Sequence, residues 1–152
     1  MLDLRWEFLY ELHADIDEPI NVGSTPQGIR RIFNVKGGTF QGPKISGKVL
    51  PTGADWVIIR SDMAAELDVR AVMQTDDDET IYTYYRGILN ISSEIYNRIQ
   101  NGEDVDPSEY YFRTAPVFET SSKIYGWLNR IVSLGVGKLG KNKVTYRVYM
   151  IL

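Results

Sequence analysis

The first segment of the chain alternates apolar and polar side chains with a period of two. Because successive side chains of a strand point to opposite faces, the alternation predicts a half-buried strand over residues 2–13. An amphipathic helix would instead need apolar residues at three- and four-residue spacing. The face expected to be buried carries Leu2, Leu4, Trp6, Phe8, Tyr10 and Leu12. His13 falls on the polar face near the strand end, where a solvent-facing or hydrogen-bonded histidine is favoured over a catalytic one.

Further segments rich in β-branched and aromatic residues are separated by turn-forming residues. Predicted strands span residues 28–36, 44–50, 55–60, 67–75, 80–89, 110–119, 124–135 and 144–152. Residues 15–27 are expected to form a long connection and residues 51–53 a turn. The glycine-rich residues 37–43 lack the spacing of a phosphate-binding loop, so a bulge or a barrel corner is the favoured interpretation.

One segment breaks this strand rhythm. Ile91, Ile95 and Ile99 recur at four-residue spacing and predict a short helix over residues 92–100. Ser92 or Ser93 is placed to cap its start, and Gly102 to end it. The chain has no internal repeat and no linker, so residues 1–152 are expected to form one domain.

The polarity of the predicted strand 124–135 favours a barrel over a sandwich. Trp127 and Asn129 share one of its faces, and Leu128 and Arg130 share the other. A sandwich strand should have one apolar face, whereas a barrel that encloses a cavity tolerates a mixed interior. The predicted fold is therefore mainly β, a closed antiparallel barrel of about eight to ten strands with one short helix.

The composition narrows the chemistry that is open to the chain. It has no cysteine and one histidine, which excludes disulfides, thiol nucleophiles and multi-histidine metal centres, so no metal is expected. A Ser-His-Asp arrangement would depend on that one histidine. The remaining acid–base groups are carboxylates, tyrosines, lysines and arginines. The 10 tyrosines suit a ligand-lined cavity as well as a packed core.

Charge and hydropathy limit the partners and the location. The net charge of −3 gives no basic footprint for nucleic acid. No apolar run approaches the roughly 20 residues of a membrane helix, and no signal peptide precedes the first strand. We therefore expect a cytoplasmic protein whose partners are a small-molecule ligand and a second copy of the chain in a homodimer, with neither nucleic acid nor membrane among them.

The predicted strand over residues 55–60 carries the first candidate ligand contacts. Trp56 and Arg60 share one face, on which they would offer an apolar wall and a cation to an acidic or phenolic ligand. The structural alternative is a tryptophan stacked under an arginine by a cation–π contact, and it has equal weight. Asp55, directly after a turn, is interpreted as a cap for backbone N–H groups.

Candidate acid–base and anion-binding residues lie on the later strands. Asp68 and Arg70 share one face of the strand over residues 67–75, where they form either a polar patch inside a barrel or an ordinary surface pair. Tyr82 is able to donate a hydrogen bond to a developing oxyanion. Arg113 and Glu119 would add an anion clamp and a base if their side chains reached the same cavity.

Several segments together resemble a widespread bacterial and fungal family of unknown function. The resemblance covers nearly the whole chain and runs through residues 28–31, 37–43, 53–56, 77–87, 111–114, 118–120 and 127–129. Asp78 departs from it, because the family often has glycine there. The resemblance implies a lipocalin-like closed antiparallel barrel. It also implies a kinship with fungal members that close oxygen rings by hydroalkoxylation without a cofactor, so no cofactor is expected.

Three functional hypotheses follow from these observations. The first is a barrel that binds an aromatic or polyketide-like molecule and acts on it by acid–base chemistry, as a cyclase or isomerase. The second is a non-catalytic carrier or sensor that uses the same pocket, and the third is a dimerising structural module with a packed interior. For the first, the proposed catalytic residues are Asp68, Glu119, Tyr82 and Arg113, and the proposed ligand-binding residues are Trp56, Arg60, Arg70, Trp127 and Asn129.

Overall fold

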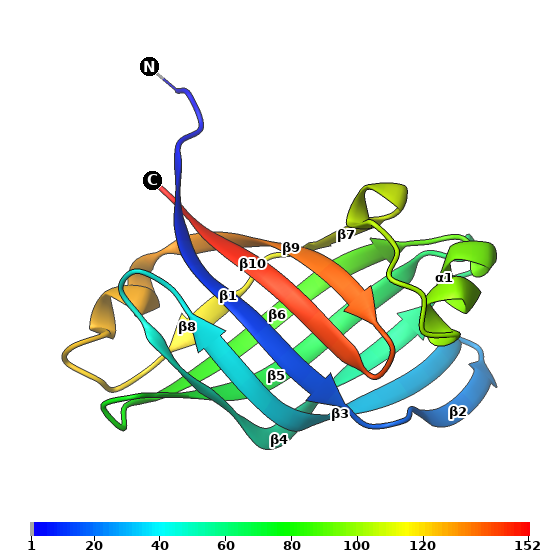
Figure 1. The fold of residues 1–152 in the computed structure, drawn as a ribbon, viewed down its shortest axis with the longest axis horizontal. Helices are drawn as coiled ribbons and strands as arrows, with labels where there is room; N and C mark the ends of the chain where they lie inside the picture. The colour runs from blue at the N-terminus through cyan, green and yellow to red at the C-terminus, as the bar shows by residue number, and fades with distance from the viewer. Residues whose placement is uncertain (1) are drawn as a thin grey trace.

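The computed structural model describes residues 2–152 and is dominated by a single antiparallel sheet of 10 strands (Figure 1). The strands are β1 (Trp6–Ile16), β2 (Ile20–Thr25), β3 (Gly28–Gln41), β4 (Ser46–Ile59), β5 (Ala65–Thr75), β6 (Thr80–Asn90), β7 (Tyr111–Thr114), β8 (Val117–Glu119), β9 (Val132–Gly140) and β10 (Lys143–Ile151). One α-helix, α1 (Ser93–Gln100), and two short 3-10 turns, Pro107–Glu109 and Gly126–Arg130, complete the fold.

The sheet closes on itself into a barrel. Its strand order is β1-β10-β9-β7-β6-β5-β4-β3, and an additional antiparallel pairing of β1 with β3 completes the ring. β2 adds to the free length of β3, and β8 pairs with β6 beside β7. The result is a closed eight-stranded antiparallel barrel with two extra strands and one short helix, which confirms the predicted fold class.

The alternation of β5 and the capping residue of α1 are both predicted correctly from the sequence. The burial of β5 alternates along its whole length, with Leu67, Val69 and Met73 buried, as the period-two pattern predicts. The predicted helix is α1: the Ser92 side chain accepts a hydrogen bond of 3.2 Å from the backbone N–H of Ile95 at its start.

The first strand begins later than its alternation predicts. A register shift between Phe8 and Tyr10 displaces the pattern, so Trp6 is 60% exposed. Leu2 and Leu4 precede β1 and are exposed as well. Beyond the shift the inward face continues through Tyr10, Leu12 and Ala14, all of them buried. The bulge moves the buried face along the chain because it inserts one residue into a two-residue period.

Two predicted connections and one predicted strand were wrong. Within the predicted loop 15–27, β1 extends to Ile16 and β2 follows. Residues 51–53 do not turn the chain, because β4 runs through them with a register shift against β5. The strand predicted over 124–135 is instead the 3-10 turn Gly126–Arg130, and β9 starts at Val132. The barrel was therefore correctly predicted from a segment that is not a strand.

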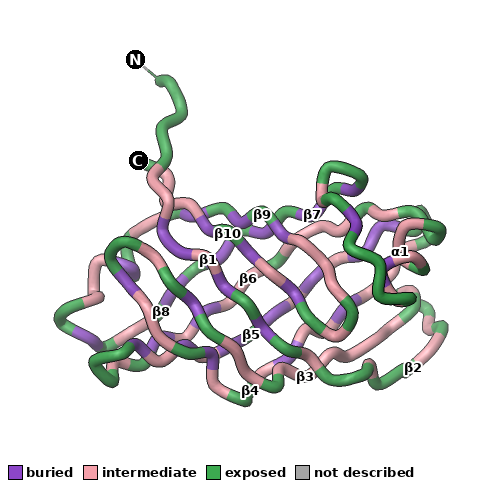
Figure 2. The backbone as a smooth tube through the Cα atoms, viewed as in Figure 1, coloured by how far each residue is buried: buried purple, intermediate pink, exposed green. Residues whose placement is uncertain are grey.

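Large apolar side chains fill one end of the barrel. Phe40, Met73, Ile81, Phe118 and Leu128 are buried there, close to the β3–β4 and β5–β6 connections. Figure 2 shows how buried and exposed positions alternate along the strands of the wall. At the other end, which carries α1 and β2 in Figure 1, the interior is not filled by side chains. Among the described residues, no helix is long and apolar enough to cross a membrane.

The closure between β1 and β3 depends on a close backbone approach at Gly38. A Cβ built there would collide with the carbonyl oxygen of His13 on β1, so only glycine fits without a shift of the backbone. We expect Gly38→Ala to lower the free energy of unfolding by about 1–3 kcal/mol, as for other overpacked sites. Urea denaturation measures this loss. Gly126→Ala is the matched control, since a Cβ there meets nothing within 4 Å; equal stability of the two variants would contradict the steric argument.

Candidate functional site

The unfilled half of the barrel is a cavity of about 660 Å³. It extends from the middle of the barrel to a rim formed by the β1–β2 connection, the β4–β5 loop, α1 and the β9–β10 turn. Most of its wall is apolar, and the wall includes Leu12, Val57, Leu67, Val69 and Phe112. Its size and apolar character are those of pockets that enclose small organic molecules.

The pleat of β4 decides which of its side chains meet the cavity. Asp55, Val57 and Ile59 line the cavity, whereas Trp56 and Arg60 point to the outside of the barrel. The registers agree on both sides, because Asp55 lies opposite Phe33 on β3 and opposite Val69 on β5, which also line the cavity. A carboxyl group is thereby placed on an otherwise apolar stretch of wall.

The surroundings of Asp55 favour its neutral form. Burial is the main cause and raises the pKa of Asp55 to about 7. The backbone N–H of Asp68 donates a hydrogen bond of 3.1 Å to Asp55 Oδ1 and limits the rise, while the negative charge of Asp68 adds to it. Asp55 therefore changes its charge close to neutral pH, as a general acid or base must.

Three tyrosines line the same part of the cavity. Tyr85 and Tyr146 make an edge-to-face contact with their ring centroids 5.4 Å apart, and Tyr10 lies on the neighbouring strand β1. Burial raises the pKa of each phenol well above its ordinary value, and the charge of Asp55 raises the pKa of Tyr85 and Tyr146 further. These hydroxyls stay protonated at neutral pH and are available as hydrogen-bond donors.

The acid–base group and the phenols thus belong to one apolar cavity. An oxygen atom of a bound molecule that met Asp55 would exchange a proton with it, and negative charge developing on that oxygen would be stabilised by phenolic donors. Within residues 2–152, no group of three His, Asp or Glu side chains is placed to hold a metal ion.

The structure places the predicted site residues of β4, β5 and β6 on the outer surface. Arg60 pairs there with Asp62 at 2.7 Å and with Glu66 at 3.2 Å. The guanidinium of Arg70 stacks over the ring of Trp56, so the cation–π alternative holds for Trp56 with a different arginine. Asp68, 3.8 Å from Arg70, and Tyr82 lie on the same outer faces. The side chains of these residues are not brought together in the cavity.

The remaining predicted site residues also lie away from the cavity. Arg113 on β7 stacks over the ring of Tyr111, and Glu119 on β8 faces outward beside Tyr82. Trp127 and Asn129 belong to the 3-10 turn Gly126–Arg130, which lies near the filled end of the barrel. Asn129 exchanges two hydrogen bonds, of 2.8 and 2.9 Å, with the backbone of Thr120. A binding or catalytic role for any of them stays an untested prediction.

Sequence reasoning missed Asp55 because it assigned the wrong face of β4 to the interior. Trp56 and Arg60 were predicted to face a ligand, although they lie on the outer face, and Asp55 was interpreted as a turn cap. One signal was available: the inward face of β5, with Leu67, Val69 and Ala71, is unambiguous from its alternation. The pairing that sets Asp55 opposite Val69, however, joins two strands, and the sequence does not reveal its register.

These features define a closed β-barrel with an acidic and phenolic cavity, and comparisons with known proteins agree with the barrel fold. The chain matches the family described as "Protein of unknown function (DUF3237)" over residues 4–151, and it belongs to that family. A "UPF0311 protein" of Rhodopseudomonas palustris (strain TIE-1) is 36% identical over 149 residues, which cover 98% of this chain and 97% of the relative.

Solved structures share the fold. A β-barrel-like protein from Acinetobacter baumannii AYE superimposes with a TM-score of 0.86 at 36% identity and covers 99% of this chain and 97% of its own. The structure of an enzyme from Penicillium herquei superimposes with a TM-score of 0.72 at 20% identity, over 98% of this chain and 95% of its own. At that identity the likeness concerns the fold alone.

The raised pKa of Asp55 predicts a specific pH dependence of stability. Between the ordinary pKa of 3.8 and the raised value of about 7, the folded chain holds a proton on Asp55 that the unfolded chain has released. The contribution of Asp55 therefore favours the unfolded state increasingly as pH rises from about 4 to about 7, and it is constant above. The size is a few kcal/mol, since one pKa unit is about 1.4 kcal/mol.

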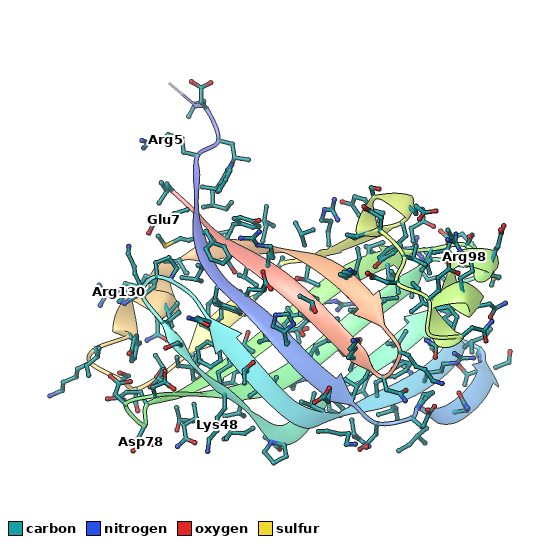
Figure 3. The ribbon with its side chains drawn as sticks, viewed as in Figure 1. Arg5, Glu7, Lys48, Asp78, Arg98 and Arg130 are labelled. Carbon is teal, nitrogen blue, oxygen red and sulfur yellow. The ribbon has the colours of Figure 1, made fainter. Side chains whose placement is uncertain are left out.

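We expect Asp55→Asn to gain stability relative to the wild type as pH rises through this window. Urea denaturation of both proteins at a series of pH values measures the difference. The control Asp78→Asn changes an exposed carboxyl in the turn between β5 and β6, at the end of the barrel away from α1 and β2 (Figure 3), and retains the contribution of Asp55. A constant difference between wild type and Asp55→Asn over the window would show that the Asp55 carboxyl is not perturbed.

Proposed function

We propose that the cavity binds a small, largely apolar molecule and that Asp55 exchanges a proton with it. The observation that carries the proposal is the position of Asp55: a carboxyl group with its pKa raised to about 7 stands on an apolar wall beside protonated tyrosines. Enzymes that run acid–base chemistry near neutral pH tune a carboxyl group by the same means. The third hypothesis, a packed interior, does not describe a barrel with a cavity of about 660 Å³.

The proposed chemistry needs a molecule with an acidic hydroxyl or an activated C–H beside an oxygen. The ionised Asp55 carboxylate accepts that proton, and the hydroxyls of Tyr85 and Tyr146 donate hydrogen bonds to the oxygen on which charge develops. Protonated Asp55 then returns the proton to another atom of the same molecule. The net reaction is an isomerisation or a ring closure, in which the proton is redistributed and nothing is oxidised or reduced.

A non-catalytic carrier is the alternative use of the same cavity. The apolar wall and the enclosed volume support binding by themselves, whatever the protonation of Asp55. The two functions differ in one respect: a carrier binds without changing its ligand, whereas the proposed enzyme depends on the carboxylate form of Asp55. An experiment that follows binding and proton transfer separately therefore distinguishes them.

A nitrobenzisoxazole tests proton transfer without knowledge of the natural substrate. A base removes the single proton on the carbon of its isoxazole ring, the N–O bond breaks, and a coloured cyanophenolate forms. We expect the wild-type rate to rise with pH and to level off above about pH 7, as Asp55 becomes ionised. Asp55→Asn should lose at least about tenfold, because a positioned base contributes roughly 10²–10⁴-fold.

The control variant is Asp78→Asn, which should keep the wild-type rate because Asp78 is exposed in the turn between β5 and β6 and does not line the cavity. Binding of the neutral fluorescent probe N-phenylnaphthylamine reports the cavity independently of proton transfer. Probe binding with no elimination would reject the enzyme and retain the carrier. Elimination of equal rate in Asp55→Asn would assign it to another base and contradict the proposed role of Asp55.

A further inference from the structure

The wall of the cavity contains one basic side chain, that of Arg31 on β3. Arg31 is half-buried and lies opposite Val57 of β4, toward the rim of the cavity. Its neighbour Arg30 points outward and donates a hydrogen bond of 2.9 Å to the carbonyl oxygen of Trp56. The pleat of β3 therefore sends one arginine to the outer surface and the other to the cavity.

Arg31 has no acidic partner among residues 2–152. Five described arginines of the outer surface have ion pairs: Arg60 and Arg98 engage two carboxylates each, and Arg70, Arg86 and Arg147 engage one each. Of the two acidic residues that line the cavity with Arg31, Glu18 accepts a hydrogen bond of 3.1 Å from Asn142 instead. The other is Asp55, for which burial and Asp68 account for the shift of the pKa.

A cation in a partly enclosed apolar wall is stabilised most by an anion that enters with the ligand. Taking the guanidinium out of water has a cost, and a carboxylate that binds both of its N–H edges offsets that cost. The planar guanidinium offers this fork to a carboxylate, sulfonate or phosphate oxygen pair. The unpaired Arg31 therefore favours a ligand with an oxyanion at one end.

The spacing between Arg31 and Asp55 sets the length of such a ligand. Arg31 pairs with Val57, and Asp55 lies two residues deeper along β4, a distance of about 7 Å between the two levels of the wall. Phe33 on β3 lies opposite Asp55 and supplies an apolar surface at the same level of the wall. An aromatic ring with substituents at opposite ends spans a comparable distance.

We infer that the cavity takes an aromatic or similarly apolar acid, whose carboxylate pairs with Arg31 near the rim and whose hydroxyl or carbonyl oxygen meets Asp55. The inference rests on the proposed function, since it names the class of molecule bound at the same site. It also sets the orientation of the ligand. The anionic end stays near the rim, and the end that exchanges the proton lies deeper in the cavity. Arg31 acts as a binding and orienting residue and takes no part in the proton transfer.

Two fluorescent probes with one skeleton test the inference. Anilinonaphthalene sulfonate carries an oxyanion, and N-phenylnaphthylamine is the same pair of aromatic groups without it. We expect Arg31→Gln to weaken binding of the sulfonate at least about tenfold, the loss of one charge-assisted contact, and to leave binding of the neutral probe within about twofold. Rising salt concentration should weaken sulfonate binding to the wild type more than to Arg31→Gln.

Two further variants keep the test decisive. Arg86→Gln removes an exposed outer-surface arginine of β6 that lies 3.9 Å from Glu66, and it should leave both affinities unchanged. Arg31→Lys keeps the charge without the fork and should bind the sulfonate with intermediate affinity. Should Arg31→Gln fail to fold, the ratio of sulfonate to neutral-probe affinity in Arg31→Lys carries the test, and a wild-type ratio there would overturn the inference.

The outcomes separate this inference from the proposed function. If both probes bind and compete for one site but Arg31→Gln leaves the sulfonate affinity unchanged, the oxyanion does not pair with Arg31, and the cavity function stands. If the wild-type chain binds neither probe, the cavity is not a ligand site, and both proposals fail. Loss of both affinities in Arg31→Gln would show that Arg31 maintains the shape of the cavity, which also contradicts the inference.

Discussion

The pairing of β1 with β3 is the interaction on which the rest of the structure depends. It joins Glu11–Ile16 to Val35–Gln41 and turns a sheet with two open edges into a ring. Closure requires a strongly coiled sheet, and the register shifts in β3 and β4 supply the bending next to this pairing. Gly38 lies at the centre of it, because its missing side chain lets β3 approach the backbone of β1.

The two ends of the closed barrel differ in how well their interiors are packed. Side chains such as Phe40, Met73 and Ile81 fill one end and provide the buried apolar area that stabilises the fold. The other end retains a cavity, so less apolar area is packed there and that part of the barrel contributes less stabilisation. The same low-polarity surroundings raise the pKa of Asp55 and leave Arg31 to be neutralised by a ligand. The incompletely packed apolar interior is therefore the cause both of the cavity and of the raised pKa of Asp55.

The sequence predicts which types of residue form the site, but it does not predict which individual residues do. With no cysteine and one histidine, chemistry based on carboxylate, tyrosine and arginine was foreseeable, and the cavity does contain Asp55, Tyr85 and Arg31. The residues chosen from the sequence, Asp68, Tyr82 and Arg60 among them, lie on the outer faces of the same strands. Successive residues of a strand point to opposite faces, and both faces carry aromatic and charged side chains. The sequence alone therefore does not show which set points inward.

Most of the strands, the capped helix and the antiparallel class could be predicted from the sequence, because these depend on alternation, propensity and short-range hydrogen bonds. The alternation in β5 and the cap at Ser92 are examples. Which face of β4 lies inside the barrel is a property of its strand pairing. Asp55 lies opposite Phe33 on β3 and Val69 on β5, and both of those side chains line the cavity. Asp55 is a cavity acid for that reason, although nothing in its local sequence distinguishes it from a turn cap.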